Sequence, residues 1–162
     1  MRLWVITRLL LLVVLANAIP VVAKKVLGNR FSRPLDGGAR CRDGQPLFGA
    51  SKTMRGIILS MLATVIGALL TGLGCKTGAL IGSAAMAGDL FSSFLKRRMK
   101  LPPSSRAIGL DQVPESLFPL LACRGPFSLT ALDTAVTVAA FFIGEVLVSR
   151  ILYKFRLRDR PY

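Results

Sequence analysis

Long apolar stretches, separated by shorter polar or basic segments, dominate the chain. Runs of about 20 apolar residues are long enough to cross the hydrocarbon core of a bilayer as helices. The shortest run contains two prolines and Glu115, so other helices must shield it from lipid. The pattern predicts an all-α integral membrane protein, a bundle of about five transmembrane helices in a single domain over residues 1–162. The predicted helices cover residues 3–23, 56–73, 77–95, 111–123 and 128–152.

Two of the predicted connections are short enough to be tight turns. Cys75 and Lys76 are predicted to join the second and third helices. Arg124, Gly125 and Pro126 are predicted to join the fourth and fifth, because glycine and proline favour turns.

The first apolar stretch is also compatible with a secretory signal. Ala16, Asn17 and Ala18 have the small-residue pattern of a cleavage site. The apolar run continues to Ala23, however, which favours a helix that is retained. Removal of this segment is the alternative.

Basic residues are concentrated on alternate connections. The chain has 22 Lys and Arg against 8 Asp and Glu, for a net charge of +14. Of the 22, 18 fall in residues 24–55, 96–110 and 150–160. Short basic loops stay in the cytoplasm. The charge pattern therefore predicts cytoplasmic loops at 24–55 and 96–110, an outside N-terminus, a cytoplasmic C-terminus and a location in the cytoplasmic membrane.

Composition excludes several kinds of site. Hydrophobic types make up 52% of the chain, which is too apolar for a soluble domain. Histidine is absent, which removes the commonest general base and a common metal ligand. The three cysteines lie far apart, so neither a disulfide framework nor a zinc site is indicated.

Small residues are frequent in the third predicted helix. Gly78 and Gly82 form a GxxxG pair, and further small residues continue to Gly88. Such residues allow helix backbones to approach closely. The third helix is therefore expected to be central to the bundle.

A polar stripe lies on this same helix. Asp89, Ser92, Ser93 and Lys96 occur at i, i+3, i+4 and i+7, so they share one helical face. A carboxylate near the bilayer centre costs about 2.5–3.5 kcal/mol on insertion scales, so it usually has a function and a partner. The alternative is a helix end at which Asp89 and Lys96 only form a pair.

A second acidic group precedes and enters the fourth helix. Asp111 and Glu115 lie one turn apart, with Gln112 between them. Magnesium prefers oxygen ligands and usually takes one or two carboxylates together with substrate phosphates. Asp89 and Asp111 would supply such a pair if the third and fourth helices pack side by side. The alternative for Asp111 is a helix cap.

The segment before the second helix is rich in glycine and basic residues. It contains Asp43, Gly44, Lys52, Thr53 and Arg55. Backbone amides and cations in such a loop suit phosphate binding. It is not a Walker A loop, because Lys52 does not directly follow a glycine. The alternative is a solvated basic loop.

Several short motifs follow one another along the chain: Asn17-Ala18-Ile19-Pro20, Asp43-Gly44, Lys52-Thr53-Met54-Arg55-Gly56, Gly88-Asp89-Leu90, Lys96-Arg97-Arg98 and Leu110-Asp111-Gln112. This ordered series resembles the CDP-archaeol synthase family, which is similar to the phosphatidate cytidylyltransferases. The loop Leu101-Pro102-Pro103-Ser104-Ser105 suggests a bacterial-type variant.

This resemblance implies a membrane enzyme that joins CTP to a phosphorylated lipid of archaetidic or phosphatidic acid type, with Mg²⁺, giving a CDP-lipid and pyrophosphate. No nucleic-acid partner is expected, and a homo-oligomer is left open. Asp89 and Asp111 would hold the metal. The expected catalytic residues are Asp89, Asp111, Lys96 and Lys52, and the expected substrate-binding residues are Asp43, Gly44, Lys52, Thr53, Arg55, Ser92, Ser93 and Arg97.

Two other classes of function remain open from sequence alone. A small transporter or channel would use Asp89, Asp133 and Glu145 as an ion path. A non-catalytic membrane protein would use its basic loops to bind anionic lipid or nucleic acid.

Overall fold

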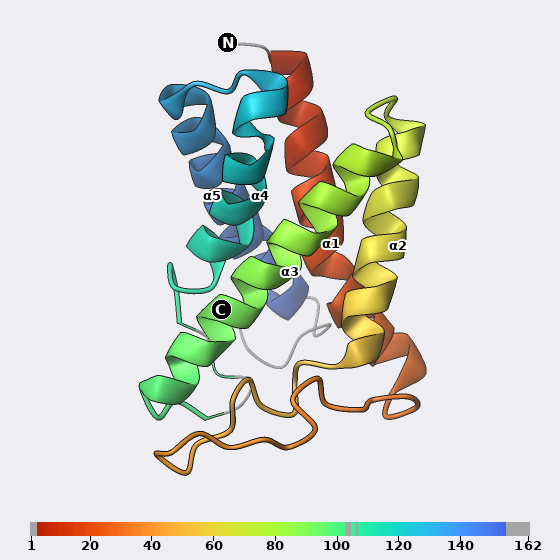
Figure 1. The fold of residues 1–162 in the computed structure, drawn as a ribbon. Helices are drawn as coiled ribbons and strands as arrows, with labels where there is room; N and C mark the ends of the chain where they lie inside the picture. Colours follow the sequence, from red (N-terminus) through yellow and green to blue (C-terminus); the bar gives the residue numbers. More distant parts are fainter. Residues whose placement is uncertain (1–2, 103–104, 106, 155–162) are drawn as a thin grey trace.

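In the computed structural model, the described part of the chain folds into five helices and long connections (Figure 1). The structure describes residues 3–102, 105 and 107–154, with only the backbone described for 151–154. Two isolated β-bridges are the nearest approach to a sheet among these residues. The prediction of five helices is confirmed. The helices are α1 (Leu3–Leu27), α2 (Met54–Leu70), α3 (Cys75–Arg98), α4 (Gln112–Phe127) and α5 (Ala131–Lys154).

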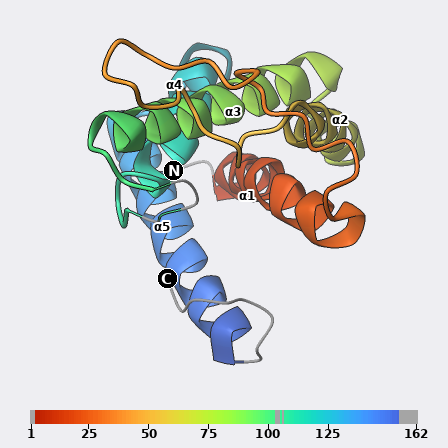
Figure 2. The ribbon, with the colours of Figure 1, turned by 90° about the horizontal axis from the view of Figure 1, so that it is seen from below.

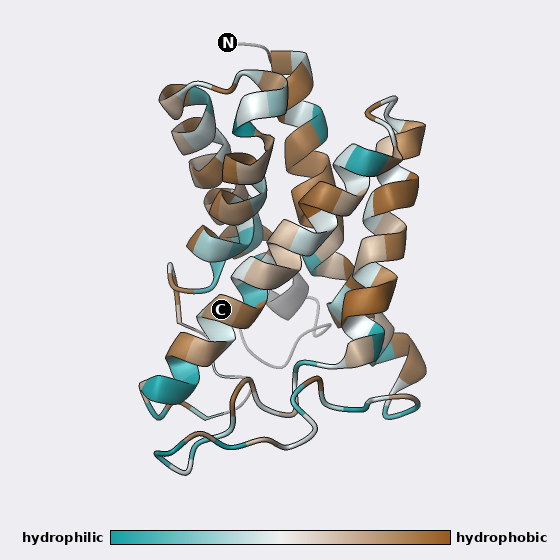
Figure 3. Cartoon of the chain, viewed as in Figure 1, coloured by the Kyte–Doolittle hydropathy of each residue, from teal (hydrophilic) through white to brown (hydrophobic). Residues whose placement is uncertain are grey.

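Three of the helices are long and apolar enough to cross a membrane. These are α1, α3 and residues Ala131–Arg150 of α5. Helix α2 is apolar but has 17 residues, which gives it a length of about 25 Å. Brown, hydrophobic segments predominate on α1 and α2 in Figure 3, and exposed large hydrophobic residues there include Leu11, Ile58 and Leu62. The predicted all-α membrane protein is thus confirmed at the level of its helices.

Helix α3 lies at the centre of the arrangement. Its most extensive contacts are with α4 and α2 on either side, and it also contacts α1, which in turn touches every other described helix. Seen from below, α5 extends away from the other helices toward its C-terminal end (Figure 2). The third helix thus packs between α2 and α4, as expected, and shares the centre of the bundle with α1.

The connections divide between the two ends of the bundle. The long loop from Gly28 to Thr53 lies at the same end as the C-terminus of α3 and the segment leading to α4 (Figure 1). The two short turns, between α2 and α3 and between α4 and α5, lie at the opposite end. One end of the molecule therefore gathers both long basic connections.

Both predicted tight turns are wrong. Cys75 and Lys76 lie in the first turn of α3, and the reversal occurs before them, where Gly72 and Gly74 have φ angles of 73° and 79°. Such left-handed angles suit glycine, which has no Cβ to clash.

The second predicted turn, at Arg124-Gly125-Pro126, lies inside α4, which continues to Phe127. The reversal is at Ser128, with φ of 50°. The amides of Ser128 and Leu129 donate to the carbonyls of Gly125 and Arg124, at 3.2 and 3.0 Å, and so satisfy the helix end. Glycine and proline in the sequence therefore indicated the right region but the wrong residues.

The close approach expected from small residues is observed at two points on α3. A Cβ added to Gly78 would lie 2.6 Å from Cα of Val65 on α2. A Cβ added to Gly88 would lie 2.2 Å from the carbonyl oxygen of Pro114 on α4. Both distances are shorter than real Cβ contacts, so glycine is needed at each crossing.

We expect Gly88→Ala to destabilise the contact between α3 and α4. The added methyl group would overlap the Pro114 backbone, which cannot move aside as a side chain can. A loss of about 1–3 kcal/mol is expected from such overpacking, measured as a lower thermal unfolding midpoint of the detergent-purified protein. Gly125→Ala is the matched control, since a Cβ there meets no atom within 4 Å. Equal midpoints for the two variants would contradict the close crossing.

Candidate active site

Three elements bring charged side chains together beside the crossing of α3 and α4. Lys52 lies at the end of the long loop, Asp89 lies in α3, and Glu115 lies in the first turn of α4. The ammonium group of Lys52 forms an ion pair with Oδ1 of Asp89, and these two side chains are 21% and 16% exposed. The carboxyl groups of Asp89 and Glu115 also lie close enough to interact electrostatically. Since Asp89 follows Gly88 and Glu115 follows Pro114, the tight backbone contact explains why these two acids meet.

A second ion pair lies further along the same interface. Nζ of Lys96 is 2.7 Å from Oδ1 of Asp111 and donates to the carbonyl of Ser105 at 3.0 Å. Lys96 lies two turns beyond Asp89 on α3, a rise of about 10 Å. Asp111 accepts a hydrogen bond from the amide of Ala107 at 3.2 Å and makes no side-chain cap on α4. The alternative that the Asp111 side chain caps α4 is therefore wrong, and this side chain pairs with Lys96 instead.

Arg97 is a buried cation next to this second pair. It is 2% exposed, and one of its terminal nitrogens, Nη2, donates to the carbonyl of Pro102 at 3.0 Å. Its Nε and Nη1 atoms have no hydrogen-bond partner among the described residues. Buried polar groups are nearly always bonded, so these two unpartnered N–H groups are suited to receive an anion.

The two serines of the α3 stripe are buried. The hydroxyl of Ser92 donates to the carbonyl of Asp89 at 3.0 Å, so its own helix already uses it. Ser93 is 2% exposed. The stripe thus lies on the inner face of α3, as its spacing indicated.

The long loop is organised around Asp36, which sequence reasoning did not select. Its carboxylate accepts hydrogen bonds from the amides of Gly38, Phe48 and Gly49, at 3.0–3.1 Å. Burial opposes ionisation of Asp36, but these amide bonds outweigh it and lower the pKa of its carboxyl group. Asp36 therefore stays charged at neutral pH and ties both halves of the loop together. In the sequence, the Asp36-Gly37-Gly38 run was the one sign that Asp36 makes a turn in this loop.

The loop is also attached to the end of α3. Nη1 of Arg98 lies 2.7 Å from Oδ1 of Asp43, and Nη2 donates to the carbonyl of Pro46 at 2.9 Å. Gly44 has a φ angle of 75°, which makes the turn beside Asp43. In this structure Asp43 and Gly44 shape the loop, and Arg98 was not among the expected site residues.

Thr53 and Arg55 hold the entry to α2. The hydroxyl of Thr53 caps the helix by accepting from the amide of Gly56 at 3.2 Å. Arg55 donates to the carbonyls of Gly28 and Arg30 at the start of the loop. These bonds place Lys52, directly before Thr53, over α3.

The two acids proposed for an ion path have other surroundings. Asp133 accepts hydrogen bonds from the amide and hydroxyl of Thr130 at 3.1 and 2.8 Å, so it caps the start of α5. Glu145 lies close enough to Glu115 for electrostatic interaction, on the side of the Asp89 cluster. Asp133 therefore serves the start of α5, and of the two acids only Glu145 lies near the Asp89 cluster.

The oxygen ligands at this interface suit a hard divalent cation. Adjacent carboxyl groups repel each other when both are charged, and a cation between them removes that repulsion. Asp89 contacts Glu115, while Asp111 contacts Lys96, so the two aspartates face one interface at different heights. Within the described residues, no group of three or more His, Cys, Asp or Glu is arranged to hold a metal alone. Substrate oxygens would have to complete the coordination, as magnesium commonly requires.

The comparisons with known proteins agree on one family. The family model described as CarS-like, CDP-archaeol synthase, matches residues 3–162. The chain is 36% identical over 143 residues to the CDP-archaeol synthase of Pyrococcus furiosus, covering 82% of this chain and 75% of that protein. It is 34% identical over 151 residues to the CDP-archaeol synthase of Thermococcus onnurineus, covering 86% and 78%.

A solved structure has the same arrangement of helices. It is described as an intramembrane enzyme for archaeal membrane lipid biosynthesis, and it is 31% identical to this chain. The TM-score is 0.72, and the match covers 87% of this chain and 90% of the other.

Proposed function

Because the chain belongs to the CDP-archaeol synthase family, we propose that Lys52, Asp89, Lys96 and Asp111 form the centre of its reaction. The protein is a CTP-dependent cytidylyltransferase that acts on a lipid phosphate and forms a CDP-lipid. The transporter and the non-catalytic membrane protein are not favoured. The observation that carries the assignment of residues is the presence of two lysine–aspartate pairs on one face of α3.

The reaction joins two polyanions, so charge is its main obstacle. An oxygen of the lipid phosphate attacks the α-phosphorus of CTP, a new P–O bond forms, and the bond to pyrophosphate breaks. The phosphate monoester is already anionic at neutral pH, so no histidine base is needed. Catalysis then consists mainly of positioning and of neutralising charge, as in other phosphoryl-type transfers.

The basic residues of the cluster have distinct roles in this proposal. Lys52 exchanges its bond to Asp89 for contact with the nucleotide phosphates. Lys96 and the unpartnered N–H groups of Arg97 hold the phosphate of the lipid, since both residues interact with Asp111. Ser92 and Ser93 line the inner face of α3 between these groups.

Four other expected residues act mainly by shaping the loop. Thr53 and Arg55 fix the position of Lys52, while Asp43 and Gly44 dock the loop on the end of α3. Their amides and cations face the same end of the bundle as the cluster, which supports contact with CTP.

We further propose that Asp89 and Asp111, which lie at different heights of the interface, hold Mg²⁺ only together with phosphate oxygens of the substrates. When bound, it would neutralise phosphate oxygens and stabilise the leaving pyrophosphate. The contact of Glu115 with Asp89 makes Glu115 a third oxygen donor at the same place. Sequence reasoning noted its position on the helix but gave it no role.

The proposed topology has the N-terminus outside and the C-terminus in the cytoplasm. Both long basic connections lie at one end of the bundle, which supports a cytoplasmic active site by the positive-inside rule (Figure 1). The proposal also keeps the whole chain as one membrane domain in the cytoplasmic membrane.

The experiment for this function is an assay with labelled CTP, detergent-purified protein and candidate lipids. We expect a labelled CDP-lipid with an archaetidic or a phosphatidic acid, formed only when Mg²⁺ is present. Chelation of the metal should stop product formation and its return should restore it. Binding of CTP without any CDP-lipid product from either lipid would contradict the enzymatic assignment.

A further inference from the structure

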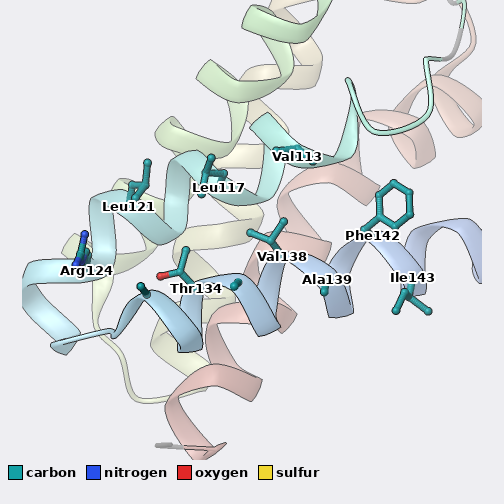
Figure 4. Close-up of a pocket in the computed structure, with 11 residues that line it drawn as sticks. Val113, Leu117, Leu121, Arg124, Thr134, Val138, Ala139, Phe142 and Ile143 are labelled. Atoms are coloured by element: carbon teal, nitrogen blue, oxygen red, sulfur yellow. The ribbon is translucent and has the colours of Figure 1, made fainter.

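An apolar groove separates α4 from α5. Its volume is about 740 Å³, within the range of roughly 300–1,000 Å³ found for ligand pockets. Figure 4 shows the side chains of the two helices facing each other across it. Its walls include Val113, Leu117 and Leu121 of α4 and Ala135, Ala139 and Phe142 of α5.

The groove is hollow because the two helices offer side chains of unequal size. Ala131, Ala135 and Ala139 recur every four residues along α5 and form one stripe. The opposite stripe on α4 carries valine and leucine. Alanine methyl groups are too short to reach across, so the helices contact each other while a channel stays open between them.

One end of the groove lies next to the reaction centre. Val113 is two residues from Asp111, and Glu115, one turn from Asp111, points to Asp89 on α3. Figure 4 shows Val113 and Phe142 at this end and Arg124 at the other. From residue 113 to residue 124 the helix rises about 16 Å, roughly half of the 30 Å hydrocarbon core. The groove thus has the length of the apolar part of one leaflet.

We infer that this groove binds one hydrocarbon chain of the phosphorylated lipid substrate. The inference rests on the proposed function and names the place of the substrate's apolar part. A lipid whose phosphate meets Lys96 and Arg97 has its first chain carbons beside Val113, where the groove begins. A second copy of this chain would bury the same apolar stripe, but it would have no reason to end at the reaction centre.

The test fills the groove and leaves the charged cluster unchanged. Ala139→Trp places an indole in the channel, whereas Ala140→Trp places it on the same helix one residue away, outside the lining. For a long-chain lipid phosphate we expect Ala139→Trp to raise KM about tenfold or more, the effect of excluding two or so methylenes. Its KM for CTP should match that of the wild type. The control should match the wild type for both substrates.

Chain length supplies a second readout that a general structural defect would not reproduce. With a short-chain lipid phosphate, the difference between Ala139→Trp and Ala140→Trp should shrink, because the short chain leaves the blocked part of the groove empty. Ala135→Leu, a smaller filling one turn away, should shift KM in the same direction if the tryptophan variant fails to fold.

The outcomes separate this inference from the proposed function. If the wild type forms no CDP-lipid, the proposed function fails. If the wild type is active and the two tryptophan variants depend equally on chain length, the groove inference alone is overturned. A change of oligomeric state confined to Ala139→Trp, measured by light scattering in detergent, would also overturn it and would identify the groove as an interface between copies.

Discussion

Replacement of Asp89 by asparagine is expected to abolish CTP-dependent formation of the CDP-lipid. Asparagine has nearly the same shape, so the crossing of α3 and α4 at Gly88 should remain. It lacks the negative charge that pairs with Lys52 and that would hold the magnesium ion. Loss of one group that stabilises charge in a transition state typically costs about 100- to 1,000-fold in rate, and we expect at least that here.

The measurement is kcat with labelled CTP for the variant and the wild type, together with their thermal unfolding midpoints. Asp133→Asn is the control, because Asp133 is another buried acid that caps α5. It should lower the midpoint while keeping activity. Normal turnover by Asp89→Asn at saturating Mg²⁺ would remove Asp89 from the metal site and from the centre of the reaction.

Replacement of Lys52 by alanine should weaken the use of CTP more than the use of lipid. Lys52 is the cation that the long loop supplies to α3, whereas Lys96 and Arg97 stand beside Asp111. A hydrogen bond to a charged group is worth about 1.5–3 kcal/mol, which corresponds to roughly a 10- to 100-fold rise in KM for CTP. The KM for lipid phosphate should change by a few-fold at most.

Lys25→Ala is the matched control for this variant. Lys25 is an exposed lysine at the end of α1, at the same end of the bundle, so it tests the general effect of removing one positive charge. Its kinetic constants should stay near those of the wild type. Equal increases in both KM values for Lys52→Ala would contradict its assignment to the nucleotide.

Much of the site could be predicted from the sequence of α3 alone. The spacing of Asp89 and Lys96 placed both on the inner face of α3, and glycines and alanines placed that face against other helices. The partners were harder to find. Lys52 is 37 residues before Asp89, and no local pattern pairs them. Glu115 was visible on the same face as Asp111, but its contact with Asp89 depends on how close α4 comes.

The roles of the loop residues also needed the structure. Thr53 and Arg55 have the right residue types for phosphate binding, yet their observed bonds go to backbone groups of the chain. Residue types indicate which bonds are available, and only the folded loop shows which are made. Asp36 demonstrates the same point, since an acid in a basic loop proved to be its organising centre.

The sequence by itself determined the five helices, the membrane class and the inner face of α3, because these follow from local apolar content and helical period. It also determined the family, through an ordered series of short motifs. Only the tertiary structure decided which lysine faces which aspartate, where the turns reverse and where a groove stays open beside α5. These features depend on how closely distant segments approach, and backbone contacts such as that of Gly88 with Pro114 set this distance.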